Sequence, residues 1–502
     1  MKKFHMGGII AALFISLAAI SCSEKISNND NQQSEYKIET YRKDFSFSFR
    51  AGSLKTMIIT NAPLWVAEDN YSWITLDVIE DESDGKVLQV SVNENETEEI
   101  RKGGFDVIAK DENGAELARV SVAVIQNPKS GLVDGAIMFE DPIFEGFMLE
   151  DFDLNGDKVL TVQEVENVRE LELENLGINS VEGIQYFKNL EYIDVSDNNI
   201  KKLDVSGLTK LKYVHFNINQ VSSFKCDGCV ALQAIMGRSN KLNNIDLSSV
   251  KESLQVLDLL NNELVKIDLT DMSILDYAAV GKNKLTSLSL AGCNKLSILT
   301  CNDNTLSSLE INDSPELLSL DCSNNFLNQL VLDKCIKLGN LDISGNSRIT
   351  SIDLSKCPII HFKAAGTKIS SLQVGDNTNI ETLNVANTLI TELNISAFKN
   401  LKKLNCSELS IKSLNLSANT LLEEIICSDC GLAELDLKGK AKLKKADVSN
   451  NKLKSVDLAA SKDIEEVNVK GNAGITLTLP KSKENDSSLK INKNEDCTIL
   501  YR

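Results

Sequence analysis

The feature that most constrains the fold of this chain is a repeat that recurs fifteen times between residues 168 and 480. Each copy has 21 residues, or 22 at two places, with apolar residues at repeat positions 1, 4, 6, 11, 14 and 16. Positions 4 and 6 alternate as in a β-strand, so both side chains point inward. One such strand buries too little surface alone, so successive copies must stack into a solenoid. At about 4.8 Å per coil, fifteen coils would extend roughly 70 Å.

The best-preserved copy runs from Leu317 to Leu332 and contains the pattern L-x-x-L-x-L-x-x-N-x-L. This pattern resembles that of leucine-rich repeats, and the resemblance covers residues 168–480. It implies a mainly β fold of about fifteen coils, with the concave sheet used for protein–protein interaction. The second apolar pair, at positions 14 and 16, indicates a short strand on the opposite wall, because 21 residues hardly leave room for a helix.

Position 9 of the repeat is asparagine in ten of the fifteen copies. The ten are Asn198, Asn219, Asn240, Asn262, Asn283, Asn304, Asn325, Asn346, Asn451 and Asn472. The side-chain amide at this turn can pair with buried backbone groups, which we expect in the next coil. Five copies carry another residue: Leu176, Thr367, Thr388, Leu409 and Cys430. We therefore expect weaker or differently bonded coils between coils 10 and 13.

The first residues indicate export. A positive start and a short apolar run predict a signal peptide over residues 1–21. The stretch from Leu17 to Cys22 resembles the lipobox of bacterial lipoproteins, which implies cleavage before Cys22 and its acylation. Ser23 then implies sorting to the outer membrane, and we expect exposure at the cell surface. Residues 22–43 are polar and predict a flexible tether.

Residues 44–128 show strand-like alternation every ten residues or so, which predicts a small β-sandwich. The segment resembles the BACON module, and three stretches carry the likeness: Ser72-Trp73-Ile74, the run from Asn95 to Gly103, and Val124-Ile125-Gln126. The resemblance implies a domain associated with carbohydrate binding. Trp65 and Trp73 could stack on a sugar; the alternative, which we favour, is that both belong to the core and that the domain is a spacer.

Residues 136–167 contain a twelve-residue segment that resembles an EF-hand loop. Its expected calcium ligands are Asp153, Asn155, Asp157, Val159, Thr161 and Glu164. Leu160 would point into the core, and the flanks 142–151 and 162–171 can be helical. Lys158 departs from the glycine usual at loop position 6, and a register starting at Asp151 would lose the final acid. We predict a structural Ca²⁺ and a segment that caps the first coil, with residues 481–502 capping the last.

Eleven cysteines remain after Cys22, and most fall on inward repeat positions. Stacking would bring Cys301 near Cys322 and Cys406 near Cys427. Disulfides are therefore sterically allowed in an exported protein, but small buried thiols explain the placement equally and are our preferred interpretation.

Positions 3, 5 and 7 of each coil should point onto the concave face. In the early coils these columns contain the residues that we predict to bind a partner: Tyr192, Tyr213, His215, Met236, Arg238, Val256, Leu260 and Tyr277. Aromatic residues, Met and Arg are typical of interaction hot spots. In the later coils the residues at these positions are small and polar.

The sequence therefore predicts a lipid-anchored, monomeric surface protein that captures a protein or peptide; the alternative is glycan binding through the BACON-like domain or the tyrosine-lined sheet. The formal charge of −19 argues against nucleic-acid binding. We do not expect an enzyme, because His215 and His361 would lie seven coils apart and no nucleophile motif or phosphate loop is present.

Overall fold

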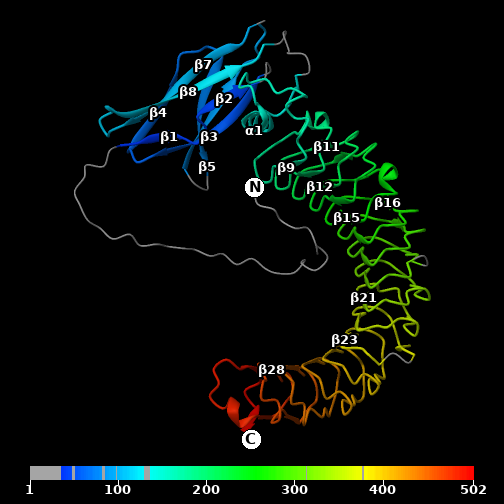
Figure 1. Cartoon of the computed structure of the whole chain (residues 1–502). Coiled ribbons are helices and arrows are strands. Elements are labelled where there is room, and N and C mark those ends of the chain that lie inside the picture. The colour runs from blue at the N-terminus through cyan, green and yellow to red at the C-terminus, as the bar shows by residue number, and fades with distance from the viewer. Residues whose placement is uncertain are drawn as a thin grey trace.

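The computed structural model describes residues 36–47, 51–81, 85–97, 99–128, 136–311, 314–375 and 378–502. Within these ranges the chain forms a small β-sandwich followed by a long curved solenoid, with one α-helix between them (Figure 1). This confirms the predicted mainly β fold. The predicted signal peptide and Cys22 lie outside the described residues.

The β-sandwich consists of two four-stranded sheets. Its strands are β1 (Ile38–Thr40), β2 (Asp44–Phe47), β3 (Gly52–Thr60), β4 (Leu64–Asp69), β5 (Ile74–Asp81), β6 (Gly85–Val92), β7 (Arg101–Lys110) and β8 (Glu116–Gln126). The sheets have the orders β1-β3-β6-β5 and β2-β8-β7-β4. Alternate side chains from both sheets, among them Phe45, Leu88, Val107 and Val124, are buried between them.

The solenoid is built on one parallel sheet of sixteen short strands, which lines the inner side of the curve (Figure 1). In spatial order these are β9 (Glu170–Glu172), β10 (Tyr192–Asp194), β12 (Tyr213–His215), β14 (Ala234–Met236), β15 (Val256–Asp258), β17 (Tyr277–Ala279), β19 (Ile298–Thr300), β20 (Ser319–Asp321), β21 (Asn340–Asp342), β22 (His361–Lys363), β23 (Thr382–Asn384), β24 (Lys403–Asn405), β25 (Glu424–Ile426), β26 (Lys445–Asp447), β28 (Glu466–Asn468) and β30 (Lys490–Asn492). Equivalent residues of adjacent coils pair in register, for example Leu320 with Leu341 and Leu341 with Phe362, and all three are buried.

The outer wall carries the predicted second strand in part of the solenoid. These strands are β11 (Lys202–Asp204), β13 (Ser223–Lys225), β16 (Lys266–Asp268), β18 (Ser287–Ser289), β27 (Ser455–Asp457), β29 (Thr476–Leu479) and β31 (Thr498–Tyr501). Three short 3₁₀ turns also occur: Ile184–Tyr186, Ser248–Val250 and Lys481–Lys483.

The asparagine ladder is present, but its direction differs from our prediction. In Asn325 the Oδ1 atom accepts the N–H of Leu306, and Nδ2 donates to the carbonyl of Cys301 in the preceding coil and to Cys322 in its own. The sequence predicts partners in the next coil. There, however, the backbone already provides the bonds: the N–H of Asn324 donates to the carbonyl of Ser344. The side-chain amide therefore pairs with backbone N–H and carbonyl groups of the preceding coil that would otherwise have no hydrogen-bond partner.

The predicted interruption of this ladder is confirmed. The hydroxyls of Thr367 and Thr388 donate only within their own coils, to the carbonyls of Ala364 and Val385. The thiol of Cys430 donates to the carbonyl of the preceding coil at Cys406, at an Sγ–O distance of 3.1 Å. At repeat position 9, coils 10 to 13 are thus bonded differently from the coils with asparagine.

The first coil is covered by helix α1 (Pro142–Phe152). The carboxylate of Asp141 accepts the N–H groups of Ile143 and Phe144 as the N-cap, and its second oxygen accepts the N–H of Asn179 in the first coil at 2.6 Å. Leu160 is buried in the solenoid core, as predicted. No helix in the described ranges is long and apolar enough to cross a membrane.

Two expectations about the ends of the solenoid were wrong in detail. Residues 162–167 form turns rather than a helix, because β9 begins at Glu170 and leaves too few residues for one. At the other end, residues 481–502 are more than a lid: β30 and β31 add a strand to each wall and so form a sixteenth coil. Ile491 pairs with Val467 in the same inward register.

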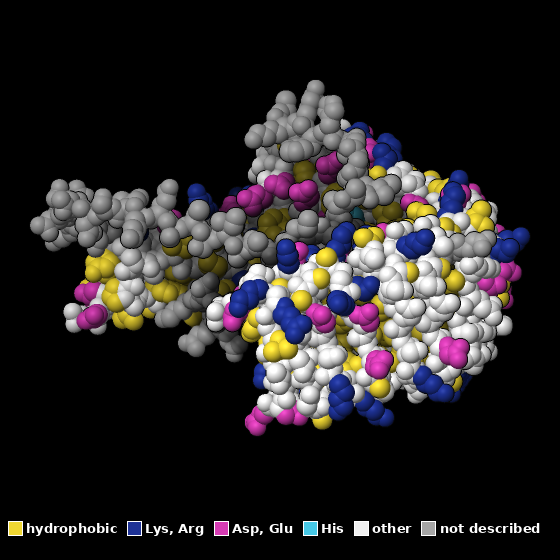
Figure 2. All heavy atoms as spheres, turned by 90° about the horizontal axis from the view of Figure 1, so that it is seen from below, with side chains coloured by type: hydrophobic (Ala, Val, Ile, Leu, Met, Phe, Trp, Pro, Cys, Tyr) yellow, Lys and Arg dark blue, Asp and Glu magenta, His cyan; other side chains and the backbone are white. Residues whose placement is uncertain are grey.

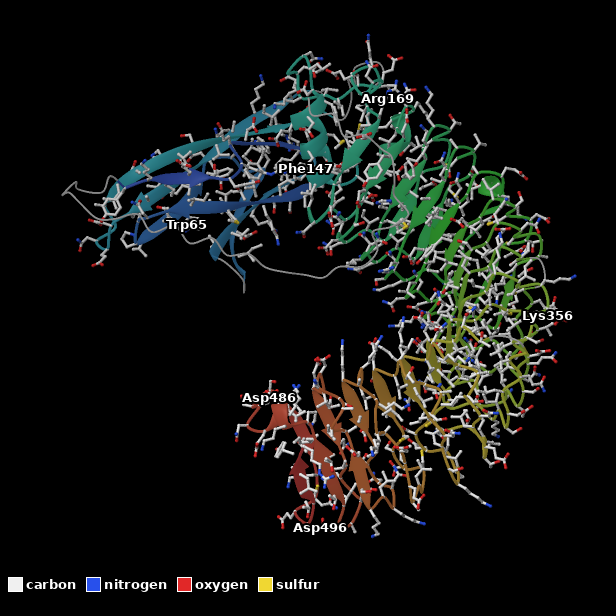
Figure 3. The ribbon with its side chains drawn as sticks, turned by 60° about the horizontal axis from the view of Figure 1, so that its bottom comes forward. Trp65, Phe147, Arg169, Lys356, Asp486 and Asp496 are labelled. Carbon is white, nitrogen blue, oxygen red and sulfur yellow. The ribbon has the colours of Figure 1, made fainter. Side chains whose placement is uncertain are left out.

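The sandwich and the solenoid meet at helix α1. The guanidinium of Arg42 lies 6.0 Å from the ring centroid of Phe45 and 5.8 Å from that of Phe147, and burial lowers the pKa of Arg42. Ile143 packs against both hydrophobic cores. Figure 3 shows Phe147 at this boundary. Strand β1 and Arg42 therefore belong to the folded domain, although residues 22–43 were expected to be a tether.

We predict that Asn325→Ala lowers the free energy of unfolding by about 2–4 kcal/mol, because it leaves several buried backbone groups unsatisfied. Thr388→Ala removes one bond within a coil and should cost only about 1 kcal/mol. Urea denaturation followed by circular dichroism measures both. Equal losses for the two variants would contradict the role assigned to the ladder.

Candidate functional site

The eight residues predicted to bind a partner lie side by side on the concave sheet. Six come from strands β10, β12, β14, β15 and β17, and the other two, Arg238 and Leu260, lie two residues after the ends of β14 and β15. All eight are half-buried. We call these eight residues the concave patch: Tyr192, Tyr213, His215, Met236, Arg238, Val256, Leu260 and Tyr277. Strand pairing aligns Tyr192 with Tyr213, and Val256 with Tyr277. The structure thus brings the predicted residues together; whether they bind a partner stays a prediction.

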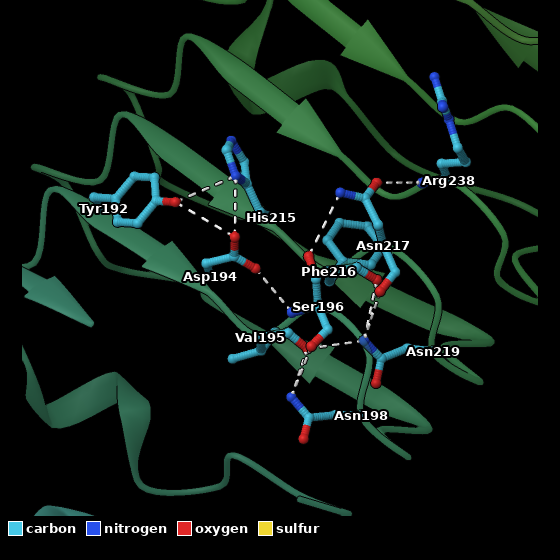
Figure 4. Close-up of polar contacts among 10 residues, drawn as sticks. All are labelled: Tyr192, Asp194, Val195, Ser196, Asn198, His215, Phe216, Asn217, Asn219 and Arg238. Atoms are coloured by element: carbon cyan, nitrogen blue, oxygen red, sulfur yellow. Dashed lines mark hydrogen bonds and ion pairs between the residues drawn. The ribbon is translucent and has the colours of Figure 1, made fainter. Parts of the chain in front are cut away.

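A polar network orders one end of the patch (Figure 4). The Nδ1 atom of His215 lies 3.5 Å from Oδ2 of Asp194, and the hydroxyl of Tyr192 lies 3.4 Å from each of these atoms. Burial favours a higher pKa for Asp194, but hydrogen bonds from His215 and Ser196 outweigh it and bring the pKa to about 2. Burial and the Asp194 charge raise the pKa of Tyr192 to about 12. The tyrosine is therefore neutral and the aspartate ionised at neutral pH.

Arg238 is held by a buried acid. Its Nη2 atom lies 2.7 Å from Oδ2 of Asp258, whose side chain is only 2% exposed, whereas the Arg238 side chain remains 41% exposed. The backbone N–H of Arg238 donates to Oδ1 of Asn217. Because the buried carboxylate neutralises it, Arg238 offers a fixed, partly exposed planar group rather than an uncompensated positive charge.

The other end of the patch is apolar. Val256, Leu260 and Tyr277 are half-buried and lie next to small buried residues of the same face, Ala234 and Ala279. Burial is the main reason that the pKa of Tyr277 is raised. When a partner covers such side chains on a rigid sheet, apolar surface is removed from water and binding becomes more favourable.

The C-terminal half of the concave face carries charged residues instead of tyrosines and apolar residues. The regular alternation of these charges was not recognised in the sequence. Lysine and glutamate pairs alternate from coil to coil: Lys402-Lys403, Glu423-Glu424, Lys444-Lys445 and Glu465-Glu466. The Nζ atom of Lys402 lies 2.8 Å from a Glu381 oxygen, and that of Lys445 lies 3.4 Å from Glu466. Figure 2 shows positive and negative side chains interspersed on the repeat domain. These charges neutralise one another, so this half offers little net charge to a partner.

Repeat position 8 is a second feature that sequence reasoning missed. The backbone φ angle is positive here in every one of the fifteen coils, and the residue is most often Asn, Asp or Gly. That composition was the signal, because these residues tolerate the left-handed conformation best. Ile218 is the exception that matters, since it is β-branched, has φ 54° and is 57% exposed. Its N–H donates to the carbonyl of Arg238, so it lies at the edge of the concave patch.

The segment predicted to bind calcium is folded as a series of tight turns. Oxygens of Asp153, Asn155 and Asp157 accept backbone N–H groups within the loop, and Lys158 adopts the positive φ of 65° that position 6 requires. Oε2 of Glu164 accepts two bonds from Thr161.

One atom in this loop fits a cation. Oε1 of Glu164 is buried without a hydrogen-bond partner among the described residues. Burial favours a higher pKa for Glu164, but the bonds from Thr161 prevail and the pKa is lowered. Across the described ranges, however, His, Cys, Asp and Glu side chains form no group of three or more that could hold a metal ion. Calcium binding by Asp153, Asn155, Asp157, Val159, Thr161 and Glu164 therefore stays a prediction.

The two tryptophans of the sandwich do not form one platform. Trp65 pairs with Ala109 on β7, whereas Trp73 packs over Gly103 of the same strand, six residues away or roughly 20 Å. Both are half-buried against the core. Trp73 also contacts Tyr71, with ring centroids 6.0 Å apart.

The inward cysteines are buried thiols. Cys301 and Cys322 are free in the structure, as are Cys406 and Cys427. Burial raises the pKa of Cys301 and Cys322, which keeps both thiols protonated at neutral pH. They serve here as small core residues.

Comparison with known proteins agrees with this architecture. Residues 64–127 match the model of the BACON family, described as an N-terminal domain with a proposed binding role. No curated protein matches the chain. Among solved structures, the functional domain of InlJ from Listeria monocytogenes, which includes a cysteine ladder, aligns with a TM-score of 0.52 and 24% identity over 64% of this chain and 76% of that one.

Two further solved structures are more distant. The internalin InlF from Listeria monocytogenes aligns with a TM-score of 0.46 and 18% identity, over 62% of this chain and 96% of that chain. The plant peptide hormone receptor RGFR1, in complex with RGF2, aligns with a TM-score of 0.44 and 17% identity, over 66% of each.

The chain therefore combines a BACON domain with a leucine-rich-repeat solenoid. The BACON family is described as a binding domain, and the solved structures show the fold of the repeat domain. His215 on β12 and His361 on β22 are seven strands apart in the sheet, roughly 34 Å, so they cannot share a site.

We predict that Ile218→Asn raises the free energy of unfolding by about 1 kcal/mol, because asparagine adopts a positive φ at lower cost. The reverse change at the equivalent position, Asn261→Ile, should lower it by a similar amount. Thermal denaturation measures both. No stabilisation by Ile218→Asn would show that the isoleucine is not strained.

We also predict that Ca²⁺ binds the loop with measurable heat in isothermal titration and raises the melting temperature, and that Glu164→Gln abolishes both effects. Glu166→Gln, at an exposed neighbouring acid, is the control and should behave as the unmodified chain. Absence of heat with the unmodified chain would refute the calcium prediction.

Proposed function

We propose that this chain is a lipid-anchored surface protein of the outer membrane that captures a protein or peptide on the concave patch. Acylated Cys22 would attach it to the membrane. The sandwich, fixed to the solenoid through α1, would hold the repeat domain at a distance from the bilayer. These two points derive from the lipobox resemblance and from the contacts of Arg42 and Ile143.

The observation that carries the proposal is the composition of the concave patch. Three tyrosines, an arginine, a methionine and two aliphatic residues lie half-buried on five adjacent strands. Their positions are fixed by strand pairing and by the buried Asp258, so little ordering entropy is lost when a partner binds. Tyrosine and arginine on a rigid surface are the residues that contribute most to protein interfaces.

We predict that the double substitution Tyr213→Ala with Tyr277→Ala weakens partner capture by at least about 2 kcal/mol, or more than tenfold. The acyl-free ectodomain would be used to capture proteins from surface extracts, followed by affinity measurement on the partner identified. Tyr186→Ala, at a tyrosine outside the patch that is 38% exposed, is the control. A partner whose affinity is the same for all three proteins would overturn the concave site.

Glycan binding is the alternative, and the same protein tests it. A glycan array probed with the ectodomain would give signals that disappear in Tyr71→Ala, because Tyr71 is 40% exposed beside Trp73. The distance between Trp65 and Trp73 makes this second function the weaker candidate.

A further inference from the structure

The first strand of the concave sheet presents an unusual row of charge. Glu170, Glu172 and Glu174 occupy positions 3, 5 and 7 of the first coil, and all three are exposed. Strand pairing places Glu170 beside Tyr192 and Glu172 beside Asp194. The row therefore borders the aromatic end of the concave patch directly.

These three carboxylates differ from the other acids in the same columns. Asp194, Asp258, Asp342, Glu424 and Glu466 form ion pairs with His, Arg or Lys. Two more accept hydrogen bonds from serine hydroxyls: Asp321 and Asp447. Within the described residues, Glu170, Glu172 and Glu174 have neither. The nearby bases are already engaged, since Arg169 and Lys212 both contact Glu191.

The surroundings of this row favour a cation for two separate reasons. Three like charges on alternate residues of one strand repel one another, and a positive group would relieve that repulsion. The rings of Tyr192 and Tyr213, whose centroids are 6.5 Å apart, present π faces that also attract cations. The negative charges of Glu172 and Glu174 contribute, after burial and Asp194, to the raised pKa of Tyr192, so they act within range of this ring.

We infer that the partner of the concave patch is a peptide segment that carries lysine or arginine next to apolar residues. Its basic side chains contact Glu170, Glu172 and Glu174 and the tyrosine faces, and its apolar residues cover Val256, Leu260 and Tyr277. This inference rests on the proposed function and specifies the partner for the same site. The alternating charges of the C-terminal half do not contribute.

The test is a selection of random linear peptides displayed on phage, carried out in parallel on four forms of the ectodomain. These are the unmodified chain, the triple variant Glu170→Gln/Glu172→Gln/Glu174→Gln, the patch variant Tyr213→Ala/Tyr277→Ala, and a control with the same charge change at exposed acids elsewhere, Glu392→Gln/Glu408→Gln/Glu434→Gln. Affinities of selected peptides are then measured at low and high salt.

We expect the unmodified chain and the control to select peptides in which Lys or Arg adjoins apolar residues. The triple variant should bind these peptides about tenfold more weakly at low salt, because three exposed ion pairs are lost, and the difference should shrink at high salt. Selected peptides without basic residues that still depend on Tyr213 and Tyr277 would overturn this inference while leaving the proposed function intact. Peptides that bind all four forms equally would overturn both.

A triple variant that dimerises or aggregates but binds the basic peptides with unchanged affinity would also overturn the inference. That outcome would show that the glutamates protect the edge of the sheet, since β9 is its terminal strand. Size-exclusion chromatography of each variant separates this role from partner recognition.

Discussion

The stacking of one coil on the next is the interaction on which the rest of this structure depends. A single three-residue strand has almost no stability, but in one parallel sheet of sixteen strands the backbone groups of adjacent coils pair with one another. The asparagine amides complete the turns that the sheet leaves open, as Asn325 does for Leu306 and Cys301. Because each coil contacts only its neighbours, we expect the missing asparagines at Thr367 and Thr388 to affect the stack locally rather than everywhere.

Stacking also explains why function can concentrate in one part of the surface. The side chains at positions 3, 5 and 7 point away from the hydrophobic core, so each coil can present a different side chain there. The N-terminal coils present tyrosines, apolar residues and the three glutamates of the first coil, whereas the C-terminal coils present lysine and glutamate pairs that neutralise one another. The BACON domain is fixed beside the first group through α1.

Sequence periodicity predicted the fold and the alignment of the concave-patch residues on one sheet, because both follow from a fixed spacing. The alignment of Tyr192 with Tyr213, or of Leu320 with Leu341, is a direct consequence of the repeat. What it did not predict lies where spacing changes or where two segments meet. The sixteenth coil begins after a longer interval, from Glu466 to Lys490, and the contact between Arg42 and Phe147 joins residues with no shared pattern.

The sequence alone determined that leucines spaced by one coil would form a continuous core, and that the intervening columns would face outward. Only the tertiary structure decided which of those outward charges have partners. Arg238 and Asp258 are 20 residues apart and become an ion pair through stacking, whereas Glu170, Glu172 and Glu174 have no basic partner in the part of the chain that the structure describes. The physical reason is that repeat spacing specifies which strands are neighbours. Which charges pair depends instead on the length of each side chain and on competing contacts, and these depend on several coils together.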